Sequence, residues 1–269
     1  MTAFAANSIL CRLALGHEHI DPGSFTAIRL LSGAVALCLL VLVGRRTYIG
    51  DGNWVSALAL VVYAAGFSFA YVSLSAATGA LLLFSSVQAT MLITAAFRGD
   101  RLRPVQMGGL ALAVVGLAGL LMPGVTAPSP LGAICMAAAG IAWGIYSLRG
   151  GRGGDPIRVT AGNFVRATAI VLAVAGIGRD HARFDSAGLE YAIASGALAS
   201  GVGYAIWYSA LPALRTTTAS VAQLGVPVIA ALGGAMVLGE TIATRWVVSA
   251  AAILLGIGVV VLSKSPTRD

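Results

Sequence analysis

Residues 218–240, TASVAQLGVPVIAALGGAMVLGE, repeat the pattern of residues 78–100, TGALLLFSSVQATMLITAAFRGD, at a shift of 140 positions. Each copy is an apolar run, a short hinge holding glycine and an acid, and then a second apolar run. The match extends over Arg215 to Leu262, with Thr218 on Thr78, Leu232 on Leu92, Ala235 on Ala95, Gly239 on Gly99, Glu240 on Asp100, Ala251 on Ala111 and Gly256 on Gly116. Upstream, a shift of 137 places Arg12 on Arg149, Arg29 on Arg166, Arg46 on Arg183, Gly66 on Gly203 and Tyr71 on Tyr208. Shifts that stay constant over such long spans indicate a duplicated unit.

The composition favours a protein that lies in a bilayer. The chain has 269 residues, of which 58% are hydrophobic and 10% charged, and its mean hydropathy is +0.90. Soluble domains carry about 25% charged residues, so this much apolar surface could not be hidden in one water-soluble core. The net charge of +7 lies in short basic clusters between apolar runs, which is typical of cytoplasmic loops. We therefore expect the lipid bilayer, and no nucleic acid, as a partner.

Ten apolar segments follow one another along the chain. They cover residues 1–15, 23–44, 54–74, 77–98, 104–122, 130–148, 158–178, 187–210, 217–238 and 244–263. Most approach the ~20 residues that a helix needs to cross about 30 Å of hydrocarbon, and they do not alternate as barrel strands do. We predict an all-α integral membrane fold of ten transmembrane helices. Aligned with residues 130–148, the first segment lacks about eight residues. Either the chain starts further upstream or the first helix is short, and we favour the upstream start.

The distribution of Lys and Arg predicts the orientation. With both termini in the cytoplasm, the inside loops hold eleven, namely Arg45, Arg46, Arg98, Arg101, Arg103, Arg149, Arg152, Arg158, Arg215, Lys264 and Arg268. The outside loops hold three, Arg179, Arg183 and Arg245. The positive-inside rule favours this arrangement, in a multi-pass protein of the inner membrane.

Five spans per unit is an odd number, so the second unit enters the membrane upside down. This predicts two inverted five-helix repeats, residues 1–124 and 129–264, with a site near the midplane between them. Such symmetry serves alternating access of one site to the two sides of the membrane.

The two units resemble the EamA repeats of the drug/metabolite transporter superfamily, and YddG-like members in particular. The resemblance covers nearly the whole chain and is strongest in residues 219–227 (ASVAQLGVP), in residues 238–240 (LGE) and at Gly256. It departs at Val87-Gln88, where the pattern and Pro227 of the second unit place a proline, so no matching kink is expected in the fourth helix. The resemblance implies a transporter, since the best-described bacterial members export amino acids and other small metabolites. It also implies a central cavity surrounded by helices 1, 3, 4, 6, 8 and 9.

Aromatic and amide side chains are the candidates for lining that cavity. Tyr63, Phe67 and Tyr71 are four residues apart and therefore share one helix face, and Tyr204 and Tyr208 repeat that spacing. Amides in mid-membrane should face the protein interior, because an unpartnered polar group in hydrocarbon is costly. The predicted substrate-binding residues are Asn7, Tyr63, Phe67, Tyr71, Gln88, Trp143, Tyr146, Tyr204, Trp207, Tyr208 and Gln223. The alternative is that the tyrosines form an interfacial belt and that Gln223 bonds a neighbouring helix.

Charged residues in or near the spans receive a structural interpretation. Arg29 and Arg166 occupy equivalent positions, which favours arginines that snorkel to the interface or cap carbonyls of a neighbouring helix; the alternative is contact with an anionic substrate. Asp100 and Glu240 are expected to complement the N-terminal dipoles of the helices that follow them. No Asp or Glu lies in the middle of a span, which favours facilitated diffusion or exchange over a carboxylate proton relay.

The remaining motifs predict no catalytic or metal chemistry. His17-Glu18-His19 has no third ligand nearby, and the glycine-rich residues 150–154 lack the end of a P-loop. Cys11, Cys38 and Cys135 lie inside apolar runs and are expected to behave as small buried hydrophobes. Small residues four apart, such as Gly109 and Ala113, mark the fifth and tenth helices as scaffold or a dimer face.

These observations predict a secondary transporter, most simply an exporter, of small metabolites such as amino acids. The protein would be a monomer or homodimer and need no cofactor. One alternative is a small multidrug, organic-cation:proton antiporter. Another is an intramembrane lipid-modifying enzyme, although the three histidines are scattered in loops. We expect no enzyme.

Overall fold

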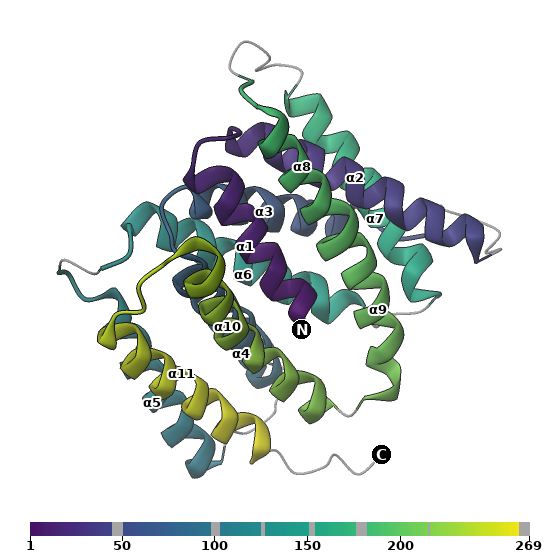
Figure 1. Ribbon diagram of the computed structural model, residues 1–269. Helices are drawn as coiled ribbons and strands as arrows, with labels where there is room; N and C mark the ends of the chain where they lie inside the picture. The colour runs from purple at the N-terminus through teal and green to yellow at the C-terminus, as the bar shows by residue number, and fades with distance from the viewer. Residues whose placement is uncertain are drawn as a thin grey trace.

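The computed structural model describes residues 1–44, 51–97, 103–124, 127–150, 154–175, 182–214 and 216–263. The regular secondary structure of these residues is helical, apart from one isolated bridge between Ile20 and Phe184 (Figure 1). The helices are α1 (Thr2–Gly16), α2 (Pro22–Val43), α3 (Trp54–Tyr71), α4 (Ala76–Phe97), α5 (Pro104–Leu121), α6 (Pro130–Gly150), α7 (Pro156–Ala175), α8 (Ser186–Ala194), the π-helix η2 (Ser195–Val202), α9 (Gly203–Ala210), the short 3₁₀-helix η3 (Leu211–Ala213), α10 (Thr216–Leu238) and α11 (Thr244–Leu262). Every predicted apolar segment overlaps one of these helices.

Several helix starts follow directly from the sequence. Proline is the first residue of α2, α5, α6 and α7, a position that does not need the missing N–H. Asp21 and Asn53 cap α2 and α3 by accepting hydrogen bonds from Ser24 N at 2.8 Å and Ser56 N at 2.9 Å. Such caps satisfy amides that have no partner inside the helix.

The molecule is apolar outside as well as inside. Seven of the described helices, α2 to α7 and α11, are long and apolar enough to cross a membrane, while α1 and residues 222–238 of α10 are shorter apolar helices. Large side chains point outward, among them Phe97 at 88% and Met236 at 85% exposure. Exposed apolar surface on this scale marks a surface that another apolar medium covers, which agrees with the predicted bilayer setting.

Helix α1 lies in the middle of the bundle, where it contacts α3, α4, α8, η2 and α10 (Figure 1). On one side of it α2 packs against α7 and η2, and on another α6 packs against both α3 and α4. The pair α5 and α11 forms an outer edge, at the lower left of Figure 1.

Glycines set the close approach of α5 and α11. A Cβ on Gly109 would lie 2.6 Å from the carbonyl oxygen of Gly256, and one on Gly116 would lie 2.9 Å from that of Ser249. Backbones this close exclude any side chain, as in other small-residue membrane interfaces. This packing agrees with the predicted scaffold role of these two helices.

We expect Gly116→Leu to lower the yield of folded protein and its melting temperature, since overpacking a close contact costs about 1–3 kcal/mol. Gly108→Leu on the same helix is the matched control, because nothing lies within 4 Å of a Cβ at that position. Size-exclusion profiles and thermal unfolding in detergent make the comparison. Equal yield and melting temperature for the two variants would contradict this packing.

Candidate functional site

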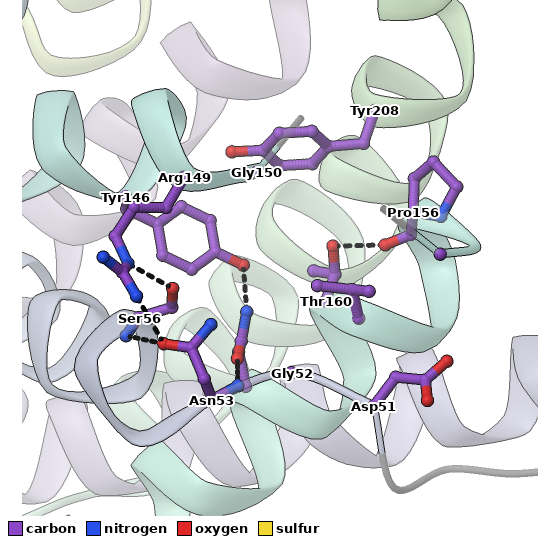
Figure 2. A pocket seen from close by; sticks show the side chains of 13 residues that line it. Asp51, Gly52, Asn53, Ser56, Tyr146, Arg149, Gly150, Pro156, Thr160 and Tyr208 are labelled. Atoms are coloured by element: carbon purple, nitrogen blue, oxygen red, sulfur yellow. Dashed lines mark hydrogen bonds between the residues drawn. The ribbon is translucent and has the colours of Figure 1, made fainter. Parts of the chain in front are cut away.

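A pocket of about 300 Å³ opens at the end of the bundle where α3 and α7 begin and α6 ends (Figure 2). We call this the pocket end, and the opposite end, where α1 ends and α4 begins, the far end. The polar side chains that line the pocket are Asp51, Asn53, Ser56, Tyr146, Arg149, Thr160, Asn163 and Tyr208. The pocket is therefore built from α3, α6, α7, α9 and the residues just before α3.

Hydrogen bonds fix the pocket walls. Arg149 donates to Ser56 Oγ at 3.3 Å and to Asn53 Oδ1 at 3.2 Å, as Figure 2 shows. Asn163 accepts from the Asn53 backbone N–H at 2.9 Å and donates to the Tyr146 hydroxyl at 3.4 Å. The pocket thus presents amide, hydroxyl and guanidinium groups held by one another.

Aromatic rings continue from the pocket into the protein. Tyr146 stacks on Trp143, with ring centroids 5.4 Å apart and an interplanar angle of 19°. Trp143 in turn contacts Tyr63 at 4.9 Å and Tyr204 at 4.8 Å. These buried rings and those of Phe67, Tyr71 and Tyr208, which join them at centroid distances of 4.7–6.4 Å, form what we call the aromatic column.

The column contains most of the predicted site residues, but these residues lie at different places relative to the pocket. Tyr71 lies at the far end, where its hydroxyl donates to the Ala76 carbonyl at 3.4 Å. Among the described rings, Trp207 reaches the column through Phe4, with ring centroids 6.1 Å apart. The tyrosines of the column are at most 5% exposed, so they do not form an interfacial belt.

Asn7 is the amide that the fold brings to the column. Its Nδ2 donates to the Tyr63 hydroxyl at 3.5 Å, and its Oδ1 accepts from Ser195 Oγ at 2.6 Å. Gln88 and Gln223 are also buried, but Gln88 Nε2 and Gln223 Oε1 have no hydrogen-bond partner among the described residues. No described contact joins either glutamine to the column, so their role in a cavity remains a prediction.

The π-helix η2 places two serines on the side that faces α1 and α2. Hydrogen bonds in a π-helix join residues five apart, so Ser195 and Ser200 lie almost above one another. In an α-helix, with 3.6 residues per turn, they would point in different directions. Here Ser195 bonds Asn7 and Ser200 Oγ lies 3.3 Å from Arg29 Nε.

Arg29 and Arg166 occupy different environments despite their equivalent sequence positions. Arg166 donates to the carbonyl of Asp51, just before α3, and to that of Gly162 in its own helix, both at 2.9 Å; neither is a carbonyl of a neighbouring helix. Arg29 is only 1% exposed and donates to the Tyr63 hydroxyl at 2.9 Å. It therefore neither snorkels to the interface nor caps a carbonyl, and that expectation was wrong for Arg29.

Glu240 closes the far end. It accepts hydrogen bonds from the Ala76 backbone N–H at 3.2 and 2.9 Å, and its Oε1 lies 3.3 Å from Arg12 Nε. Arg12 also donates to the carbonyls of Tyr71 and Val72. The carboxylate thus caps α4 and not α11, whose preceding residue is Ala243; the prediction named the wrong helix. Asp100 and Gly99 lie outside the described residues.

The loops at the far end are joined by two aspartates. Asp21 accepts from the Arg183 backbone N–H at 3.0 Å, and Asp185 lies 2.7 Å from His19 Nδ1. Burial raises the pKa of the Asp21 carboxyl, but hydrogen bonds from Ser24 and Arg183 outweigh it and leave that pKa below its usual value. The Gly188 N–H and His19 lower the pKa of Asp185. Both acids are therefore ionised caps that link the two halves of the chain.

Several residues at the site were missed or set aside. Phe4 contacts Trp143, Tyr204 and Trp207, and its spacing of three from Asn7 could have placed it on that face. Asn163 is a buried amide like those selected and carried the same signal. Ser195 and Ser200 carried no signal, because their shared direction depends on the π-helix.

In the described ranges, no group of three or more His, Cys, Asp or Glu side chains could hold a metal ion. The rings of His17 and His19 lie 6.0 Å apart, and His19 is engaged by Asp185.

Comparison with known proteins gives three findings. The EamA-like transporter family matches residues 1–122 and again residues 130–262. The uncharacterized protein PA1977 of Pseudomonas aeruginosa is 51% identical over 261 residues, which cover 97% of this chain and 91% of that protein. A solved crystal structure superposes with a TM-score of 0.68 at 19% identity, over 97% of this chain and 96% of the other; at that identity the likeness concerns the fold alone.

Proposed function

Because the chain belongs to the EamA-like transporter family of the drug/metabolite transporter superfamily, we propose that it is a secondary transporter that exports small metabolites such as amino acids by alternating access. It is a multi-pass membrane protein whose family members are transporters. Within the family, the proposal places it with the YddG-like exporters, as a monomer or homodimer of the inner membrane with both termini in the cytoplasm.

We propose ten transmembrane helices in two inverted repeats, residues 1–124 and 129–264. The contacts between α5 and α11 support this arrangement. The 140-residue shift relates Gly109 to Ser249 and Gly116 to Gly256, and the close approaches are Gly109 with Gly256 and Gly116 with Ser249. Each contact is therefore the image of the other, as a two-fold axis requires, and such an axis in the membrane plane belongs to inverted repeats.

The observation that carries the proposal is the difference between the two ends of the aromatic column. At one end Tyr146 and Tyr208 face an open polar pocket. At the other, Tyr71 is covered by α4 and by the contacts of Glu240 with Arg12 and Ala76. A path that is open at one end and closed at the other is what one state of an alternating-access transporter requires. With cytoplasmic termini, the open end would face the cytoplasm, where an exporter loads.

The lining favours a zwitterion over an organic cation. Rings with amide and hydroxyl groups suit a neutral or zwitterionic solute, whereas an organic-cation:proton antiporter needs a carboxylate that titrates along the path. Of the described carboxylates at the two ends of the column, Glu240 at the far end is paired with Arg12 at 3.3 Å, and Asp51 at the pocket is paired with Arg158 at 3.1 Å. The organic-cation antiporter and the lipid-modifying enzyme therefore remain as outcomes of the test.

The test is solute flux in proteoliposomes that contain the full chain. Efflux and uptake of amino acids, organic cations and lipid precursors are followed with and without an imposed proton gradient, against protein-free liposomes. We expect amino acids to move down their gradients whether or not protons do. Cation movement that demands a proton gradient would favour the antiporter, and chemical conversion of a lipid without flux would favour the enzyme.

A further inference from the structure

The guanidinium of Arg29 lies deep in the protein, beside the aromatic column. It contacts the hydroxyl groups of Tyr63 and Ser200, and its Cζ lies 5.1 Å from the Tyr63 ring centroid and 4.8 Å from that of Phe67. Tyr63 is also the ring that contacts Trp143 and the hydroxyl that Asn7 reaches. Arg29 is thus one side chain away from the residues that lead to the pocket.

Nothing in the described residues neutralises this buried charge. No carboxylate of the described ranges is recorded in an ion pair with Arg29, whereas Arg12 and Arg158 are paired with acids. Its Nη1 is buried without any hydrogen-bond partner in the part of the chain that the structure describes. A buried charge is costly unless it is paired and hydrogen-bonded, and hydroxyl groups and ring faces compensate it only in part.

From this we infer that Arg29 binds the carboxylate of the transported solute. The Nη1 group is a free donor for one carboxylate oxygen, and guanidinium–carboxylate pairs form parallel hydrogen bonds when a second N–H turns to the same partner. In this structure the rings of Tyr63 and Phe67 cover the cation. A solute that enters past Tyr146 and Trp143 would displace this ring contact and supply the missing negative charge.

This inference deepens the proposed function and rests on it, because it names the chemical group that the transporter selects. Amino acids and other organic carboxylates are the substrate class. Amines and amides that lack the anion would leave the buried charge uncompensated, and a site built around such a charge rejects ligands that cannot meet it.

Arg166 supplies the matched control. It is the repeat equivalent of Arg29, but backbone carbonyls of Asp51 and Gly162 hold it, and it lies over the ring of Trp54, outside the column. A substitution there removes the same side chain from the same sequence context in the other half of the chain.

The experiment compares wild type with Arg29→Met, Arg29→Lys and Arg166→Met in two assays. The solutes are L-leucine and L-phenylalanine, their amides, and the corresponding acids without the amino group, 4-methylpentanoate and 3-phenylpropanoate. Proteoliposome flux gives transport, and the shift of melting temperature in detergent gives binding. Wild type should prefer the acids to the amides by about tenfold or more, Arg29→Met should lose that preference, and Arg166→Met should keep it.

The melting temperature without solute separates binding from scaffolding. A buried cation without an anion destabilises the empty protein, so Arg29→Met should be as stable as wild type or more stable. A clear fall in its melting temperature would overturn the inference, as would an acid preference that survives in folded Arg29→Met. If Arg29→Met does not fold, Arg29→Lys is the deciding variant, because lysine keeps the charge without the planar fork of the guanidinium. Arg29→Lys should weaken the acid preference but not abolish it. An unchanged acid preference in Arg29→Lys would overturn the inference.

Failure of the inference and failure of the proposed function look different. Equal flux of acids and amides in wild type refutes the role of Arg29 and leaves a transporter. A carboxylate-dependent melting shift that needs Arg29, without flux of any solute, refutes transport and leaves the carboxylate site. If wild type shows neither flux nor a melting shift with any carboxylate, the inference falls together with the proposed function.

Discussion

Trp143→Ala is expected to lose most of its transport activity, roughly tenfold or more, and to remain inserted in the membrane. The indole contacts the rings of Phe4, Tyr63, Tyr146 and Tyr204, and each aromatic pair contributes about 0.5–1.5 kcal/mol beyond the area it buries. Loss of two or more such contacts costs about 1.4 kcal/mol or more. This lowers the population of the ring arrangement, and with it the flux, about tenfold or more. Proteoliposome flux at matched protein content is the measurement.

Two controls separate an effect on the path from a general loss of fold. Trp143→Phe keeps a ring at the same position and should retain a substantial part of the flux. Trp54→Ala removes a tryptophan that is 62% exposed and lies outside the column, so it should transport like wild type. Normal flux in Trp143→Ala would show that solute does not pass along the aromatic column.

Glu240→Gln is expected to loosen the far end. The substitution keeps the shape of the side chain but removes the charge that holds Arg12 and caps α4. Breaking this partly buried ion pair leaves Arg12 without its counter-ion and destabilises the state that contains the pair, so the population with an open far end should rise. A change of about 1.4 kcal/mol corresponds to a tenfold change in that population.

Cys11 reports this opening, because it precedes Arg12 and is fully buried. With Cys38 and Cys135 replaced by serine, its rate of reaction with a water-soluble thiol reagent should rise about tenfold in Glu240→Gln, in proportion to the open population. Glu190→Gln is the control, since Glu190 is an exposed acid early in α8. Unchanged labelling of Cys11 would mean that Glu240 does not hold the far end shut.

Much of the fold follows from sequence patterns that need no tertiary information. Prolines at the starts of α5, α6 and α7 and the capping Asp21 and Asn53 mark helix ends locally. The segment predicted at 104–122 is α5 at Pro104–Leu121. The segment predicted at 187–210 is divided into α8, the π-helix η2 and α9. That irregularity arises where Gly196 packs on the backbone of Arg29, a contact that no local pattern encodes.

In the candidate site, too, some features could be predicted from the sequence and others could not. The spacing of Tyr63 and Phe67 places both rings on one helix face, and the column contains them. The partners of Arg29 come from α3 and η2, which are distant in sequence, so the sequence offered only the position of Arg29 within a span and its symmetry with Arg166. Symmetry predicted a shared role, and the different surroundings of the two side chains separate them.

We propose that the two ends of the aromatic column open in turn. The experiment labels Cys11 at the far end and a cysteine introduced by Thr160→Cys in the pocket, with impermeant thiol reagents on vesicles of known orientation. Without solute, we predict labelling at position 160 from one face and protection of Cys11. A transported solute should raise labelling of Cys11 from the opposite face while labelling at position 160 falls. Simultaneous labelling of both positions, or labelling of both from the same face, would contradict alternating access through this column.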